Sequence, residues 1–401
     1  MRDFSPENAG FLTLNAGSSS LKVALFPATG DTPLITGQAD RIGPEGVLKL
    51  KDAEGNLLEN AAGTIDSHGH ALAVVIATIK RVLPDLGMAA VGHRVVHGGL
   101  DYAEPVLVTP EVIAKLTELE PFAPLHQPHN IAGIRAAEAA FPGVPQVACF
   151  DTAFHRGQPF VNDTFAIPHR YYEIGVRRYG FHGLSYDYVT GELARIAPHL
   201  MQGRVVVAHL GNGASMCAIH RGRSVASSMG FSALDGLPMG TRCGQIDPGV
   251  LLYMLDREHL DTAQIRQVLY NESGLLGLSG GLSNDMRALE QADTAQSHRA
   301  IDYFVFRVQR ELGAMAAVMG GIDALVFCGG IGENSRVIRR RVCERLGWMG
   351  IEIDHGKNAE SATILSSDFS RTTVMIVPTR EDLVIARAAR AAAGHVEEMQ
   401  R

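Results

Sequence analysis

The residues best suited to chemistry lie in short segments where asparagine, glycine and serine follow an apolar run. The clearest is NAGSSSLK, residues 15–22. Backbone N–H groups of successive residues in such a turn can converge on a phosphate, and serine hydroxyl groups add donors. A plain hairpin needs only two turn residues. The segment therefore predicts a phosphate-binding turn, although Lys22 is equally well explained as a solvated strand residue.

The same plan recurs half a chain later. LTLNAGSSSLKVAL begins near residue 12 and VVVAHLGNGASMCAI near residue 205, and both read as strand, Asn/Gly/Ser turn and strand. Two copies of one hairpin predict a duplicated domain, with the copies facing each other across a cleft. Hairpins with such turns are common, so a chance resemblance is the alternative.

A third glycine-rich segment is ALVFCGGIGENS at 324–335, which reads as a strand, a turn and a helix. It differs from the dinucleotide fingerprint because Ser335 occupies the third glycine position. Glycines still allow a base and ribose to approach the backbone closely, and a helix N-terminus favours phosphate. The chain is not a P-loop enzyme, because HGKN at 355–358 lacks the rest of the Walker motif.

Two arginines lie between glycines. Arg94 is in VGHRVVHGG and Arg242 is in MGTRCGQIDPG. Either one alone is more simply read as a solvated or salt-bridged side chain. Together, two guanidinium groups can grip a carboxylate or a transferring phosphoryl group through paired hydrogen bonds.

Two acidic residues and one histidine complete the candidates. Asp151 directly follows an apolar strand, where α/β sheets bind ligands, and Glu381 lies between a strand and a helix. Such carboxylates can bind Mg²⁺, and the alternative is helix capping. His182 lies in YGFHGLS, but with sixteen histidines in the chain any single one is more often structural.

Composition limits the class of protein. With 401 residues, 46% hydrophobic and 20% charged, the chain predicts a soluble globular protein of two domains. A net charge of −7 argues against nucleic acid and anionic membranes as partners. We see no membrane-spanning run and no signal segment at the N-terminus. The five cysteines are scattered without C-x-x-C, which favours reduced thiols and a cytoplasmic location.

Strand-like and helix-like segments alternate along the chain, which predicts an α/β fold. The strand candidates are 11–15, 21–26, 89–96, 144–150, 204–210, 215–220, 324–328 and 373–377. The helix candidates are 71–83, 130–140, 185–197, 249–258, 298–319 and 382–393.

From about residue 11 to 390 these segments together resemble the acetate kinase family. The segments that carry the resemblance are NAGSSSLK, GHRVVHGG, FDTAFH, YGFHG, HLGNGAS, SMGFSALDGL, MGTRCG, DPG, GIGENS and PTREDLVIAR. The family belongs with sugar kinases, heat-shock ATPases and actin, so the resemblance implies duplicated ribonuclease H-like domains flanking a nucleotide cleft. It implies one domain at 1–154 with a returning helix at 383–401. The second, at 155–382, would carry the adenosine site.

The resemblance also implies a role for each matching residue. The catalytic residues would be Arg94, Asp151, His182, Asn212 and Arg242. The acetate site would be formed by Arg94, Val96, Leu125, Phe181, Ala233 and Arg242. ATP or ADP would be bound by Ser18, Ser20, Lys22, His209, Leu210, Gly211, Asn212, Gly213, Asp285, Met286, Arg287, Gly330, Ile331, Gly332 and Asn334. Asn15 and Glu381 would bind Mg²⁺, with Mn²⁺ as an alternative and Asp151 linked to the same ion.

The implied reaction is reversible, direct in-line phosphoryl transfer from ATP to acetate, giving acetyl phosphate and ADP. A carboxylate is already ionised at neutral pH and needs no general base. It needs positive charge around the transition state. The alternatives are a propionate or other short-chain acyl kinase, a sugar-type kinase or chaperone-like ATPase, and a nucleotide-binding regulator. The resemblance alone implies a homodimer.

A few positions depart from the family pattern. Ala233 stands where many members have Pro, and we expect a slightly larger acyl pocket with measurable propionate activity. Leu184 and Tyr186 stand where Thr and His are usual, and QPHN at 127–130 replaces Asn-Pro-Pro-Asn. Arg380 replaces a smaller polar residue. None removes a residue assigned to the chemistry, and we expect effects on loop packing or rates.

Overall fold

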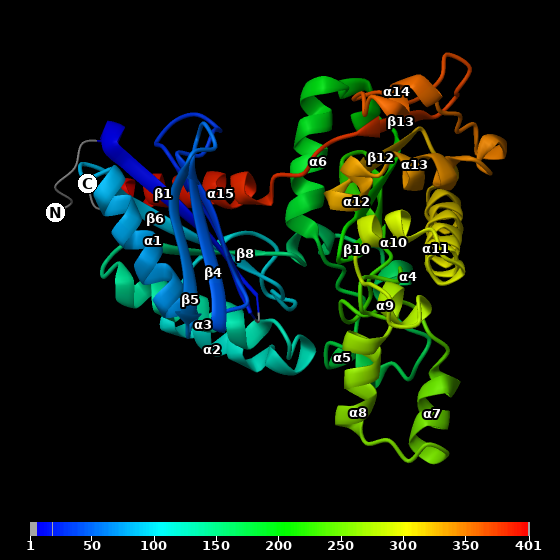
Figure 1. The fold of residues 1–401 in the computed structure, drawn as a ribbon, viewed down its shortest axis with the longest axis horizontal. Helices are drawn as coiled ribbons and strands as arrows, with labels where there is room; N and C mark the ends of the chain where they lie inside the picture. The colour runs from blue at the N-terminus through cyan, green and yellow to red at the C-terminus, as the bar shows by residue number, and fades with distance from the viewer. Residues whose placement is uncertain (1–5, 18, 400–401) are drawn as a thin grey trace. The chain divides into compact units, whose positions relative to one another are not determined.

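The structure is a computed structural model that describes residues 6–17 and 19–399. The chain divides into two compact units (Figure 1). Unit 1 comprises Met1–Ala153 and Arg380–Arg401, and unit 2 comprises Phe154–Thr379. The sequence placed the return to the first domain at 383, whereas the chain enters unit 1 again at Arg380.

Unit 1 is built on one eight-stranded sheet with the order β5-β4-β3-β2-β1-β6-β8-β7. Its strands are β1 (Ala9–Ala16), β2 (Ser20–Phe26), β3 (Ile35–Asp40), β4 (Gly43–Asp52), β5 (Leu57–Ile65), β6 (Gly87–Val95), β7 (Val106–Leu107) and β8 (Gln146–Phe150). Its helices are α1 (His68–Val82), α2 (Pro110–Glu118), α3 (Gln127–Ala140) and α15 (Glu381–Met399). α1 and α3 pack together on one side of the sheet, and α15 packs on β1, β6 and β8 (Figure 1).

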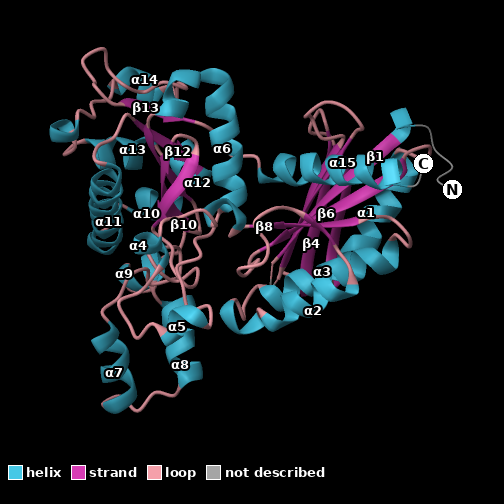
Figure 2. Cartoon of the chain, turned by 180° about the vertical axis from the view of Figure 1, so that it is seen from behind, coloured by secondary structure: helices cyan, strands magenta, loops and turns pink. Residues whose placement is uncertain are grey.

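Unit 2 has a five-stranded sheet with the order β11-β10-β9-β12-β13. Its strands are β9 (Arg204–Leu210), β10 (Ala214–His220), β11 (Arg223–Ser227), β12 (Ala324–Cys328) and β13 (Thr373–Ile376). Its longer helices are α6 (Gly183–Ile196), α7 (Pro248–Asp256), α11 (Ala295–Met319) and α13 (Arg336–Cys343). Its shorter helices are α4 (Phe160–Asp163), α5 (Arg170–Glu173), α8 (Thr262–Gln267), α9 (Gly274–Leu278), α10 (Met286–Ala292), α12 (Gly329–Asn334) and α14 (His355–Ala359). Helices α6 and α11 lie on opposite sides of this sheet (Figure 2).

The two sheets share one five-stranded plan. In unit 1, β2 is antiparallel to β1, β3 is antiparallel to β2, and β6 and β8 follow in parallel. In unit 2, β10, β11, β12 and β13 repeat these directions around β9. The hairpins β1–β2 and β9–β10 occupy equivalent places, so the repeated sequence plan reflects a repeated topology.

Local sequence explains how the elements that carry the candidate residues begin and end. The central strands β1, β8, β9 and β12 are almost wholly buried, as their continuous apolar runs predict. α11 begins with a capping box formed by Thr294 and Ser297, and ends at Gly320, which adopts a left-handed φ of 70°. The predicted turn after 324–328 is wrong in one respect: α12 begins directly at Gly329.

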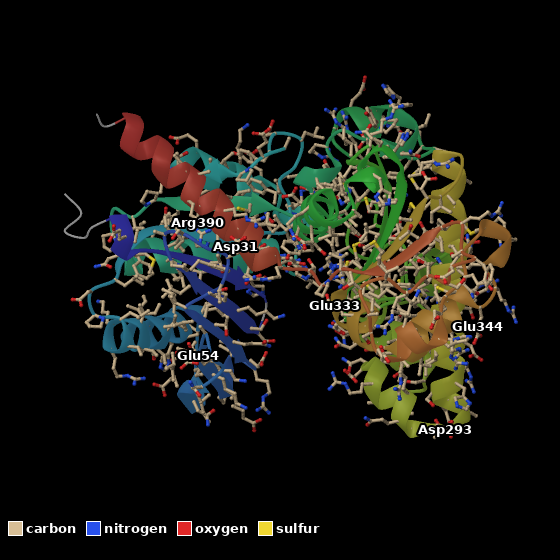
Figure 3. The ribbon with its side chains drawn as sticks, turned by 90° about the horizontal axis from the view of Figure 1, so that it is seen from above. Asp31, Glu54, Asp293, Glu333, Glu344 and Arg390 are labelled. Carbon is tan, nitrogen blue, oxygen red and sulfur yellow. The ribbon has the colours of Figure 1, made fainter. Side chains whose placement is uncertain are left out.

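The returning helix α15 is held to unit 1 by its own charged residues. Arg387 Nη2 lies 2.5 Å from Asp31 Oδ2, and Arg390 Nη1 lies 3.7 Å from Asp31 Oδ1. Figure 3 labels Asp31 and Arg390 on these two segments. α15 therefore places Glu381, its first residue, at a fixed point beside the sheet of unit 1.

Candidate active site

Three of the predicted residues lie around the guanidinium group of Arg94 in unit 1. Arg94 Nε donates to Asp151 Oδ1 at 2.9 Å and Nη2 donates to Asp151 Oδ2 at 2.5 Å. Nη1 donates to Asn15 Oδ1 at 3.2 Å, and Nε lies 3.8 Å from Glu381 Oε2. β1, β6 and α15 each contribute one residue, and Asp151 directly follows β8. The ends of parallel neighbouring strands meet at one edge of the sheet, which brings these side chains together.

Opposing effects act on the pKa of Arg94. Burial lowers the pKa of the guanidinium group, but the charges of Asp151 and Glu381 raise it further, so the net shift is upward. Arg94 therefore stays charged at every physiological pH. Both oxygens of the Asp151 carboxylate accept hydrogen bonds from this cation.

The first glycine-serine turn is fixed by residues from α1 and α3. Asn130 Nδ2 donates to the carbonyl of Ala16 at 2.8 Å, and Asn130 Oδ1 accepts from the N–H of Val96 at 2.9 Å. His68 Nε2 lies 2.7 Å from the carbonyl of Gly17. Asn130 is buried, so one side chain links the turn after β1 to the chain just beyond Arg94.

The second set of predicted residues meets in unit 2, at the turn between β9 and β10. A Cβ added to Gly213 would lie 2.8 Å from Arg242 Nη2 and 3.2 Å from His182 Nε2. The N–H of Gly240 donates to the carbonyl of Asn212 at 3.0 Å. Arg242 Nη1 donates to the carbonyl of Ala233 at 2.7 Å. A guanidinium group and an imidazole therefore lie against one glycine turn.

His182 is held in a specific orientation at the start of α6. It is the N-cap residue and has a left-handed backbone with φ of 57°, which is uncommon for a residue other than glycine. Its ring stacks on His209, with centroids 4.2 Å apart and planes inclined by 18°. His182 Nδ1 lies 2.8 Å from Ser215 Oγ, and His209 Nδ1 lies 2.8 Å from Ser185 Oγ.

The two segments predicted to bind adenosine are linked within unit 2. Ser335, the N-cap of α13, contacts the carboxylate of Glu290 in α10. Glu333 Oε1 accepts from the N–H groups of Gly329 at 2.9 Å and Thr379 at 3.1 Å, and Figure 3 labels Glu333. α10 and α12 therefore belong to one connected region, which contains Asp285, Met286, Arg287, Gly330, Ile331, Gly332 and Asn334.

Comparison with known proteins gives the family. The sequence model of the acetokinase family matches residues 10–387. The chain belongs to the acetokinase family. An acetate kinase of Methylocella silvestris is 56% identical over 388 residues, covering 94% of this chain and 96% of that protein. An acetate kinase of Rhodopseudomonas palustris is 50% identical over 386 residues, covering 94% of this chain and 96% of that protein.

Solved structures of the acetokinase family show the same fold. The crystal structure of Porphyromonas gingivalis acetate kinase is 37% identical with a TM-score of 0.87, and the match covers 96% of this chain and 99% of that one. A propionate kinase from Francisella tularensis is 36% identical with a TM-score of 0.89, at the same coverage. The prediction of an α/β fold of the actin-like ATPase class is confirmed.

Four further residues were predicted to bind the nucleotide. One of them lies outside the described residues, and three have surroundings that an ordinary structural role explains. Ser18 lies outside the described residues. Lys22 is exposed on β2, as the solvated alternative predicts. Asp285 caps α10 by accepting from the N–H of Ala288 at 2.9 Å, and Met286 is buried.

The predicted acyl pocket stays a prediction because its residues are divided between the units. Val96 and Leu125 belong to unit 1, and Phe181 and Ala233 belong to unit 2. Phe181 is almost fully buried, at 2% exposed.

Sequence reasoning missed several residues that hold the predicted ones in place. Asn130 and Ser215 lie in the quoted segments QPHN and HLGNGAS, but no role was assigned to either residue. Arg339 is a fully buried arginine whose Nη1 donates to the carbonyls of Gly332 and Glu333 in α12. The sequence RRR at 339–341 offers no sign that its first arginine is the buried one.

No helix within 6–17 and 19–399 is long and apolar enough to cross a membrane. Over the same ranges, no group of three or more His, Cys, Asp or Glu side chains is arranged to hold a metal ion.

Proposed function

We propose that this protein is an acetate kinase that transfers the terminal phosphoryl group of ATP to acetate, reversibly and in one in-line step. The observation that carries the proposal is the placement of two guanidinium groups and an imidazole donor among the predicted residues. Arg242 and His182 border the turn at Gly213 in unit 2, and Arg94 stays charged in unit 1. Positioned positive charge is the main requirement of phosphoryl transfer.

The surroundings of Asp151 favour a carboxylate acceptor over an alcohol. A kinase that phosphorylates an alcohol benefits from a base that removes the hydroxyl proton. Both oxygens of Asp151 accept hydrogen bonds from Arg94, so this carboxylate is already engaged. Acetate is ionised at neutral pH, and it can attack without losing a proton.

We assign the phosphoryl contacts to the two glycine turns and the arginines. The turn after β1 and the turn at Gly211–Gly213 would donate backbone N–H groups to phosphate oxygens. Arg242 would hold the transferring group through a forked pair of N–H bonds, and His182 would donate from Nε2. Arg94 would hold the acetate carboxylate and orient its attacking oxygen.

We infer that Asn15, Asp151 and Glu381 bind Mg²⁺, with Mn²⁺ as an alternative ion. Their amide and carboxylate oxygens are the hard donors that these cations prefer. All three lie against one guanidinium group, so the donors converge within unit 1. When bound, the ion supplies neutralisation of charge on the phosphate oxygens.

An acceptor screen tests the proposal. Acetate, propionate, butyrate and glycerol would be compared with ATP and Mg²⁺ in a hydroxylamine assay for acyl phosphates and an ADP-release assay. We expect acetyl phosphate formation at the highest kcat/KM and no glycerol-dependent ADP release. ADP release with glycerol, or no product with any acid, would contradict the proposal.

Propionate is the second candidate acceptor because of Ala233. Arg242 donates to the carbonyl of Ala233 at 2.7 Å, so this arginine contacts the backbone of a residue that we expect to line the acyl pocket. Proline would occupy more space there than alanine. One methylene changes binding in an apolar pocket by only about 1–3 kcal/mol, so we expect propionate turnover below that of acetate. Equal kcat/KM for acetate and butyrate would contradict this preference.

We also propose a cytoplasmic homodimer. α7 has four exposed apolar side chains, Val250, Leu252, Tyr253 and Leu255, and no buried residue. An apolar helix face of this kind marks an interaction surface. The scattered free thiols of five cysteines suit the reducing cytoplasm.

A further inference from the structure

A buried line of hydroxyl groups leads from Tyr186 to His182 in unit 2. Tyr186 is 0% exposed, and its hydroxyl lies 2.5 Å from Ser215 Oγ. Ser215 is equally buried, and its Oγ lies 2.8 Å from His182 Nδ1. These three groups form one continuous chain of hydrogen bonds between α6 and β10.

The direction of the first bond follows from counting donors and acceptors. Among the residues that the structure describes, Ser215 is the hydrogen-bond partner of the Tyr186 hydroxyl. If Ser215 donated to Tyr186, the phenolic proton would be buried without an acceptor, which is unfavourable. Tyr186 therefore donates to Ser215. Burial raises the pKa of Tyr186 well above its ordinary value, so the proton stays on the phenol.

The second bond then has one favourable direction. The Ser215 hydroxyl accepts from Tyr186, and its own proton points to His182 Nδ1. A neutral imidazole whose Nδ1 is an acceptor carries its proton on Nε2. A doubly protonated ring would present N–H to Ser215 at Nδ1, and the serine proton would then lose its acceptor.

The Nε2 atom faces the glycine turn. A Cβ at Gly213 would lie 3.2 Å from His182 Nε2 and 2.8 Å from Arg242 Nη2. His182 also stacks on His209 with ring centroids 4.2 Å apart, so charge on both rings at once is unfavourable. Nε2–H is therefore directed to the place where Arg242 already presents positive charge.

We propose that Tyr186 and Ser215 are positioning residues that fix His182 as a neutral imidazole protonated at Nε2, so that Nε2–H donates to the transferring phosphoryl group. Only the claim that a phosphoryl group accepts the hydrogen bond from His182 Nε2–H rests on the proposed function. The protonation state itself concerns the free protein. A fixed donor needs no reorganisation when charge develops on the phosphoryl oxygens.

NMR of the full-length protein with ¹⁵N-labelled histidine tests the protonation state. The signals of His182 would be identified as those lost in His182→Gln. At pH 7 we expect Nδ1 unprotonated and Nε2 protonated in the unmodified protein, and a mixture of both neutral forms in Tyr186→Phe. A proton on Nδ1 of the unmodified protein, alone or together with Nε2, would overturn the proposal.

Kinetics test the positioning role. We expect Tyr186→Phe and Ser215→Ala each to lower kcat about 10-fold, less than the roughly 10²–10³-fold typical of removing a direct donor. KM for ATP and acetate should change little, because the lost interaction belongs to the transition state. Tyr188→Phe removes a hydroxyl from the same helix and should leave kcat unchanged.

The double variant separates this role from general damage. Both residues act through one ring, so Tyr186→Phe/Ser215→Ala should be no slower than the slower single variant. Additive losses, or single variants with unchanged kcat, would overturn the positioning role. If the unmodified protein makes no acetyl phosphate, the proposed function fails, and the NMR result still decides the protonation state of His182.

Discussion

At the scale of residues, the two arginines differ in what surrounds them. Arg94 contacts oxygens of Asn15, Asp151 and Glu381. Arg242 contacts a backbone carbonyl and borders a glycine turn. Carboxylate and amide oxygens therefore surround the first arginine, whereas the second lies beside a turn that we propose binds phosphate.

Removing either arginine should affect chemistry more than nucleotide binding. We expect Arg94→Ala and Arg242→Ala to lower kcat by roughly 10²–10³-fold with a modest change in KM for ATP, because each loses charge stabilisation in the transition state. Steady-state kinetics would measure both constants. Arg195→Ala is the matched control, since Arg195 pairs with Glu192 on the surface of α6. Preserved turnover in both variants would remove the assignment.

Buried histidines should make stability depend on pH. Burial lowers the pKa of His93 and of His155 from 6.5 to about 4. Below pH 6.5 the unfolded chain binds protons that the folded chain does not, so stability falls as pH drops from 6.5 to 4. Each histidine contributes up to about 1.4 kcal/mol per pH unit. Urea unfolding at pH 7 and 5 would measure the slope.

The variant His155→Gln isolates one of these contributions. Glutamine can still donate to the carbonyl of Phe181, which lies 3.0 Å from His155 Nε2, and it does not titrate. We expect a lower stability at pH 7 and a smaller loss between pH 7 and 5. An unchanged pH slope would show that His155 does not carry the effect.

At the scale of residues, the sequence predicted candidate site residues that lie at or near the ends of apolar strands. It did not predict the residues that hold these candidates in place through hydrogen bonds. Arg94, Asp151 and Glu381 stand out because charge follows an apolar strand or precedes a helix. Asn130 and Ser215 lie in segments that the sequence did single out, but their partners are 114 residues away at Ala16 and 33 residues away at His182. Only the fold reveals such pairs.

At the scale of elements, the β9–β10 turn must remain free of side chains. Gly213 lies against Arg242 and His182. We expect Gly213→Ala to fold, because no left-handed φ is required there, and to lose most activity, because the added methyl group displaces both side chains. Circular dichroism and kcat would be measured together.

The chain offers a matched control for that substitution. Gly191 lies within α6 with no atom within 4 Å of an added Cβ. Gly191→Ala should keep full activity and add about 0.5–1 kcal/mol of stability, since alanine is the better helix former. Full activity in Gly213→Ala would contradict the proposed role of the turn.

Among the helices and strands, those with a regular spacing of apolar residues or a continuous apolar run could be predicted from the sequence. The hairpins at 11–26 and 204–220 and the helices α1, α6 and α11 all lie where the sequence placed them. The sequence did not predict β3, β4 and β5, because residues 35–65 mix lysine, aspartate, glycine and leucine without an apolar run. These strands pair edge to edge and extend the sheet of unit 1.

At the scale of the whole molecule, the repeated five-stranded plan explains why each unit has a glycine-containing turn in the hairpin at the centre of its sheet. Equivalent hairpins place the turn after β1 and the turn after β9 at equivalent edges of their sheets. Duplication was predictable from the echo at residues 12 and 205. The helix at 382–393 was predictable from its own composition, but its return to unit 1 was implied only by the family resemblance, because an Ala/Arg-rich sequence carries no sign of the sheet on which it packs.

Self-association is testable through α7. We expect the unmodified protein to sediment as a dimer and Leu252→Glu/Tyr253→Glu to sediment as a monomer, because charged side chains oppose burial of this face. Analytical ultracentrifugation would measure both. Phe369→Glu is the control, since Phe369 is 87% exposed on a loop of unit 2. An unmodified monomer would exclude the dimer, and a dimeric double variant would exclude α7 as its interface.

The most direct measurement is a crystal structure with ADP, Mg²⁺, acetate and aluminium fluoride in place of the transferring phosphoryl group. We predict that Arg242 and His182 Nε2 donate to the fluoride, that Arg94 donates to the acetate carboxylate, and that no carboxylate side chain contacts the attacking oxygen. Guanidinium groups turned away from both ligands, or Asp151 released from Arg94 and bound to that oxygen, would contradict catalysis by positioned positive charge.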